Sequence, residues 1–117
     1  MPSIIPLDGG ESNANYSISV TLGDYAVILE LHYQQNGQWF MHVISDGDSG
    51  ELPVKTVDGV DYIAMGLMLE SGMDIIGMYN IKKIFGQLFF VGEEANLNNL
   101  GTGNELVWFS PEEAISW

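Results

Sequence analysis

The stretch YSISVTLGDYAVILELHYQQNGQWFMHVIS, residues 16–45, decides the fold of this chain. Apolar side chains alternate with polar ones from Tyr16 to Leu22, which is the period of a strand with one dry face. Gly23-Asp24 supplies a tight turn, and Asn36-Gly37 is a strong hairpin signal because both residues tolerate positive φ. The sequence therefore predicts a three-stranded antiparallel meander with strands over residues 16–22, 25–33 and 38–45.

The second half of the chain has shorter and less regular strand segments. Val57–Val60 indicates another turn, and three glycines interrupt the apolar stretch Ile63–Tyr79, which argues against a helix there. Further strands are expected over residues 87–91 and 105–109, and Ser110-Pro111 is typical of a helix start. Five to seven short strands at this spacing predict an all-β fold, a small antiparallel sandwich or barrel with a three-stranded N-terminal meander.

The length of 117 residues predicts a single β domain over residues 1–117, with residues 1–15 as an extended N-terminal arm. Pro6 restricts the residue before it to an extended conformation. We expect the arm to order only in the assembly, where it would lie along the sheet edge of a neighbouring protein. The alternative is that it folds back and caps the chain's own barrel. Its apolar anchors in either case are Ile4, Ile5 and Leu7.

The strong negative charge of the chain limits the kinds of molecule that it can bind. The chain has 16 acidic residues, three lysines and no arginine, with a formal net charge of -13. Nucleic-acid binding proteins neutralise phosphates with Lys and Arg, so we expect no direct nucleic-acid binding. The acidic surface is either solvated or favours a basic partner. The apolar runs are too short for membrane insertion, the N-terminus lacks signal-peptide features, and the absence of cysteine excludes disulfides and thiolate metal sites.

Two groups of residues could bind metal, but neither pattern is complete. His32 and His42 would lie near each other if their strands pair, with Glu30 on the same face. Solvent-facing or interface positions are the commoner reading of such a pair. A second acidic group lies in one loop without the register of a calcium-binding EF-hand: Asp46, Asp48 and Glu51. With no phosphate loop or nucleophile motif present, we expect no catalytic, cofactor-binding or metal site and no enzyme activity.

Adjacent aromatic residues are the best local sign of how the protein works. They are Trp39-Phe40, Phe89-Phe90 and Trp108-Phe109. One member of each pair should fill the core, and the other needs cover from a second layer or from a partner chain. A two-sided core within one barrel is the alternative. A small-molecule- or carbohydrate-binding β-barrel module would instead hold Trp39 or Trp108 in an open cleft as a stacking platform.

The chain also carries an ordered series of segments: Ile5–Leu7, Tyr16–Tyr25, Leu29–Tyr33, Gly37–Met41, Ile44–Gly47, Gly66-Leu67, Gly72–Ile76, Leu88–Val91, Asn99–Gly101 and Leu106–Phe109. In this order they resemble the phage baseplate plug proteins, small tail proteins of contractile phages that include one described in a cyanophage. Members of this family are expected to carry arginine after the second strand. This chain departs from that pattern, because it has His32-Tyr33 there.

The resemblance implies a structural protein of the virion, placed in the baseplate hub near the end of the tail tube. It implies hub, tail-tube and wedge proteins as partners, several copies in a three- or six-fold assembly, and synthesis in the host cytoplasm. It brings no catalytic residues and no cofactor.

Overall fold

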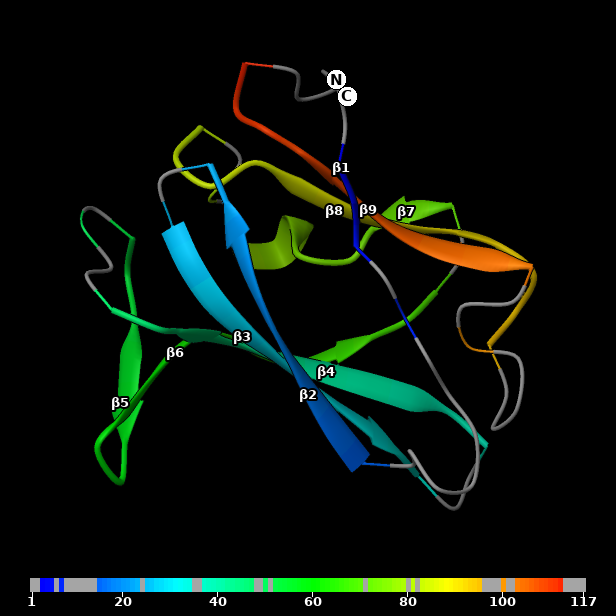
Figure 1. Cartoon of the computed structure of the whole chain (residues 1–117), viewed down its shortest axis with the longest axis horizontal. Helices are drawn as coiled ribbons and strands as arrows, with labels where there is room; N and C mark the ends of the chain where they lie inside the picture. Colours follow the sequence, from blue (N-terminus) through cyan, green and yellow to red (C-terminus); the bar gives the residue numbers. More distant parts are fainter. Residues whose placement is uncertain are drawn as a thin grey trace.

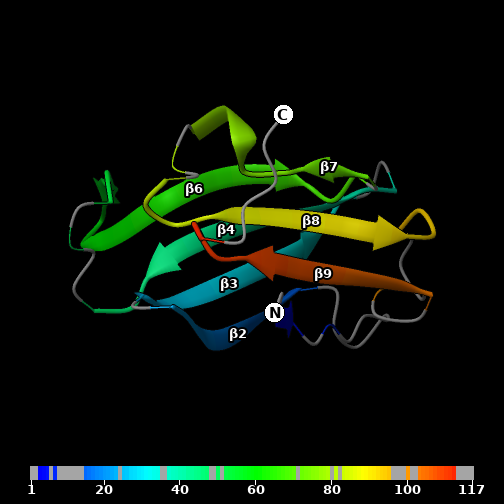
Figure 2. The ribbon, with the colours of Figure 1, turned by 90° about the horizontal axis from the view of Figure 1, so that it is seen from above.

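Two antiparallel sheets form a sandwich in the computed structural model, which describes residues 3–5, 7, 15–23, 25–34, 37–47, 50, 52–70, 72–79, 81, 83–95, 100 and 103–112. The five-stranded sheet has the order β2 (Asn15–Leu22), β3 (Tyr25–Tyr33), β4 (Trp39–Ser45), β6 (Val60–Met68) and β5 (Lys55–Val57). The four-stranded sheet has the order β1 (Ser3–Ile5), β9 (Asn104–Phe109), β8 (Gln87–Gly92) and β7 (Met73–Asp74). Figure 1 shows the sheets as two layers, and Figure 2 shows β8 and β9 lying over β3 and β4. The expected all-β sandwich is confirmed.

The N-terminal meander is confirmed strand by strand. β2 pairs with β3 over its whole length, from Asn15↔His32 to Leu22↔Tyr25, and β3 pairs with β4 over seven residue pairs. Gly37, at φ 89°, donates its N–H to the Gln34 carbonyl, which closes the second turn. Asp24, Gln35 and Asn36, the other residues expected in the two turns, lie outside the described residues.

A two-residue turn joins β5 to β6, as the sequence of residues 57–60 indicates. Val57 pairs with Val60, and between them Asp58 and Gly59 have φ of 50° and 80°. Positive φ at both central positions defines a type I′ turn, which matches the twist of a hairpin. The hairpin therefore fixes the register of the sheet edge at this end.

β6 contains bulges where it crosses β4. Met41 pairs with Leu67 and Val43 with Ala64, so β6 has one more residue than β4 between these two pairs. Gly66, at φ 68°, lies within this extra length. A glycine with left-handed backbone is the usual way to accommodate a bulge in a strand. The glycine-interrupted stretch from residue 63 is therefore a bulged strand followed by β7 and the 3₁₀ helix η2 (Gly77–Tyr79), rather than a long helix.

The core lies between the two sheets and follows the strand period. In β3 every second residue is fully buried: Val27, Leu29 and Leu31. Side chains of β4, β8 and β9 meet them from both layers: Met41, Val43, Leu88, Phe90, Leu106 and Trp108. Burying each large apolar side chain contributes roughly 1.5–3 kcal/mol before the ordering entropy is subtracted. The residues between the buried ones on β3, such as Ile28 and Glu30, therefore face the outer side of the sheet.

The first strand follows the alternative for the N-terminal arm, in which it folds back on its own chain. β1 pairs with β9 of its own chain, through Ile4↔Val107 and Ile5↔Leu106. Ile5 is buried in the chain's own core. The expectation that these residues order only along a neighbour is therefore wrong for Ser3–Ile5, because a sheet edge and core space are available on the same chain. At the other end, Pro111 and Glu112 form a turn, and the expected helix beyond them lies outside the described residues.

Gly86 is held where β8 begins beside the end of β9. Its φ is 111°, and a Cβ added there would overlap the backbone carbonyl oxygen of Phe109. Only glycine allows this close approach without moving one of the two chains. The position therefore fixes how the two central strands of this sheet meet.

Candidate interaction surface

Four rings form a cluster on the outer face of the five-stranded sheet, the face away from the core. We call this group the ring cluster: His32, Phe40, His42 and Tyr62. His32 stacks on Phe40 with ring centres 5.1 Å apart, and both contact His42 at 5.6 and 5.4 Å. Tyr62 meets His42 edge to face at 5.7 Å. All four side chains are half-buried. The rings therefore pack on one another, and part of each remains accessible to solvent among the described residues.

The sheet register brings these rings together. His32 lies directly opposite Phe40, and Glu30 lies opposite His42 on the same pair of strands. Cross-strand neighbours in an antiparallel pair are close enough for their side chains to pack. The expectation that the two histidines would be neighbours is therefore confirmed. His32 is further oriented by a hydrogen bond of 2.8 Å between its Nδ1 and the Oδ1 of Asn15.

The β6 bulge fixes the orientation of His42. The backbone N–H of Gly66 donates to His42 Nδ1 over 3.0 Å, so the neutral imidazole carries its proton on Nε2. Burial lowers the pKa of His42, and the nearby His32 lowers it further, whereas Glu30 raises it. His42 is thus favoured in the neutral form that accepts the Gly66 bond.

Tyr79 caps the free side of the same bulge. Its hydroxyl accepts the N–H of Met65 and donates to the carbonyl of Met65, both over 2.9 Å. One side chain therefore satisfies both backbone groups of a residue that β5 does not reach. Met65 itself is 38% exposed, and Met78, next to Tyr79 in sequence, is 82% exposed. The bulge is held by side chains on both sides, His42 from one and Tyr79 from the other.

A hollow of about 520 Å³ adjoins the ring cluster on the outer face. The cross-strand row Ile28, Ile44 and Tyr62 lines it, together with the acidic residues Glu30 and Asp61. Ile44 is buried and the other four are half-buried. We call this feature the acidic hollow, because it combines an apolar floor with two negative groups.

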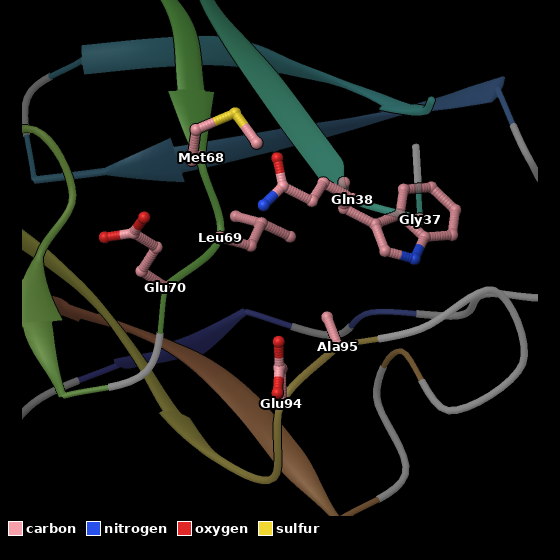
Figure 3. Close-up of a pocket in the computed structure, with 8 residues that line it drawn as sticks. Gly37, Gln38, Met68, Leu69, Glu70, Glu94 and Ala95 are labelled. Carbon is pink, nitrogen blue, oxygen red and sulfur yellow. The ribbon is translucent and has the colours of Figure 1, made fainter. Parts of the chain in front are cut away.

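A second cavity, of about 370 Å³, opens at one end of the sandwich (Figure 3). Glu70, just after β6, and Glu94, just after β8, line it from the two sheets, and both are exposed. Its floor includes the buried Trp39 and Leu69. The cavity is a gap between sheet ends that carries acidic groups and no described histidine or lysine.

The structure places the two candidate metal-binding groups, the histidine pair and the acidic loop, differently. His32 and His42 are brought together, but their Nδ1 atoms are bonded to Asn15 and Gly66. Within the part of the chain that the structure describes, no three His, Cys, Asp or Glu side chains are placed to hold a metal ion. Of the acidic loop, Asp46 is exposed, and Asp48 and Glu51 lie outside the described residues.

Trp39 and Trp108 do not form the open platform that a carbohydrate-binding module needs. Trp39 is 1% and Trp108 6% exposed, and the indole N–H of Trp108 donates to the Phe85 carbonyl over 3.0 Å. The adjacent Phe40 points outward into the ring cluster. Each aromatic pair at Trp39 and Trp108 is thus split between the core and an outer face. The alternative hypothesis, in which Trp39 or Trp108 is an open stacking platform, therefore does not fit these two residues.

Tyr62 and Gly66 are parts of this surface that the sequence analysis did not identify. The available signal was Gly66 itself, since an isolated glycine in an apolar strand pattern indicates a bulge. No comparable signal links Tyr62 to His42, because the bulges shift the register of β6 against β4.

A comparison with known protein families shows the family to which the chain belongs. A family model described as "Cyanophage baseplate Pam3 plug gp18" matches residues 3–112. No curated protein matches the chain. None of the described helices is long and apolar enough to cross a membrane. The match spans almost the whole sequence and agrees with the ordered segments noted above. The chain therefore belongs to the family of the cyanophage baseplate Pam3 plug gp18.

Proposed function

We propose that this chain is a non-enzymatic structural component of the baseplate hub, placed near the end of the tail tube, and that it acts by packing against neighbouring proteins. Family membership supports a structural role in the virion tail and association with other baseplate proteins. The finer proposal names hub, tail-tube and wedge proteins as partners, a three- or six-fold assembly, and synthesis in the host cytoplasm as one domain over residues 1–117.

The ring cluster is the observation that carries the packing mechanism. Phe40 is a half-buried aromatic side chain on an outer sheet face, beside three further rings. Aromatic residues are enriched in protein interfaces because they bury large areas with little loss of rotamer freedom. Met65 and Met78, both exposed, lie at the β6 side of the same sheet and add adaptable apolar surface.

Mass spectrometry and cryo-electron microscopy of purified tails test the proposal. The chain should be present in intact tails, with density at the hub. Phe40→Ala should reduce its incorporation while the purified variant remains folded. Phe109→Ala is the matched control, because Phe109 is also half-buried but lies on the four-stranded sheet beside Phe89. Absence from purified tails, with abundant protein in infected cells, would contradict the structural role. Normal incorporation of Phe40→Ala would contradict packing through the ring cluster.

A further inference from the structure

We propose that the acidic hollow receives a lysine or arginine side chain from a neighbouring baseplate protein. This inference rests on the proposed function and names the chemistry of the partner at one place on the surface.

The shape of the hollow suits a long basic side chain. Ile28 and Ile44 lie opposite each other on β3 and β4, and Tyr62 lies opposite Ile44 on β6. This row forms an apolar floor in a space of about 520 Å³. Lys and Arg bury aliphatic stems on such surfaces and keep the charged end at a polar group. The stem would therefore lie on the two isoleucines, with the cation near the Tyr62 ring.

The two carboxylates supply the complementary charge. Glu30 follows Ile28 by two positions on β3, so both face the hollow. Asp61 also lines the hollow, and its Oδ1 accepts the Thr56 hydroxyl over 2.6 Å. Among the described residues no lysine forms an ion pair with either carboxylate, and the chain has no arginine at all. A basic side chain from outside would give both groups a charge-assisted hydrogen bond, which is stronger than one between neutral groups.

Charge also argues for a different protein rather than a second copy. Each copy carries a net charge of -13 and only three lysines. Two such surfaces repel, whereas a basic neighbour is attracted and oriented by the same field. A metal ion is a poorer occupant, since the described residues offer no three-ligand group and His42 Nδ1 already accepts the Gly66 N–H.

The test is a pair of charge-matched double variants complemented into phage. Glu30→Gln with Asp61→Asn removes both charges of the hollow and keeps the shape of each side chain and an acceptor for Thr56. Glu105→Gln with Glu112→Gln removes two exposed charges from β9 and the segment after it. Both double variants have a net charge of -11, that is -13 plus two. Melting temperatures of the purified proteins verify that both are folded.

We expect incorporation of the hollow variant into tails to fall at least about tenfold, since truncating one side of a buried charge pair costs an interface about that much or more. The control variant should incorporate like wild type. Cryo-electron microscopy of wild-type baseplates should show a Lys or Arg side chain against Glu30 and Asp61. Normal incorporation of the hollow variant, or an apolar or empty hollow in the assembled baseplate, would overturn the inference. Absence of wild type from the baseplate would instead defeat the proposed function.

Discussion

Replacing Trp108 with phenylalanine should cost this fold about 2–4 kcal/mol. Trp108 is 6% exposed, and its Nε1 donates to the Phe85 carbonyl over 3.0 Å in a buried setting. Without the indole, that carbonyl loses its donor, which costs about 1–3 kcal/mol. The smaller ring also leaves unfilled space against Gly23, which lies close to the outer edge of the indole, and this adds about 1 kcal/mol.

The expected loss converts to a measurable change in melting temperature. Unfolding entropy is about 2.1 cal/mol/K per residue, so for 117 residues it is about 0.25 kcal/mol/K. Each kcal/mol then lowers the melting temperature by about 4 °C, and Trp108→Phe should melt about 8–16 °C below wild type. Scanning calorimetry measures this directly. Met78→Ala, at a residue 82% exposed, is the control and should shift it by about 2 °C or less. A Trp108→Phe midpoint within about 3 °C of wild type would refute the reasoning.

Three further predictions concern the backbone and the ring cluster. Gly86→Ala should lower the free energy of unfolding by more than about 3 kcal/mol, because the new Cβ would overlap a backbone carbonyl. Gly66→Ala has open space around it and should lower the free energy of unfolding by about 1–2 kcal/mol, because of its positive φ alone. Equal losses for the two variants in urea unfolding would contradict the overlap at Gly86. The lowered pKa of His42 means that the unfolded chain binds a proton more readily, so wild-type stability should fall as pH drops below about 6.5. His42→Asn keeps an acceptor for Gly66 and removes the titration, so its unfolding free energy should fall less over that range; parallel curves would exclude His42 as the source. Tyr79→Phe should speed hydrogen exchange at the Met65 N–H and cost about 1 kcal/mol, and an unchanged exchange rate would show that the hydroxyl does not protect that amide.

The regular strands could be predicted from the sequence because their signals are local. Alternation between Tyr16 and Leu22 marks one dry face, and the glycines after it mark the turns. β6 could not be predicted in the same way. Its bulges depend on which strand lies beside it. The sequence alone indicates only that Gly66 interrupts the strand pattern, because its N–H bonds to His42, which is distant in sequence. Pairing between β1 and β9 joins the two ends of the chain, so no local pattern reports it.

The candidate surface was predictable only in part. Neighbouring positions for His32 and His42 follow from one hairpin register, which the sequence supports. The addition of Tyr62 depends on β6, and the hollow depends on three strands meeting with a shifted register. Surface features built from several strands can therefore be predicted only when the tertiary arrangement is known, whereas features within one hairpin can be predicted from the sequence.

The two edges of the five-stranded sheet differ in how readily they can pair with a further strand. On the β6 side, β5 is only three residues long, and beyond it the Tyr79 hydroxyl occupies both backbone groups of Met65. On the opposite side, β2 is eight residues long, carries no charge or proline, and pairs with β3 alone among the described residues. Unpaired strand edges accept further strands unless charge, proline or a bulge prevents it. Any continuation of this sheet into a neighbouring molecule would therefore proceed from β2, in one direction only.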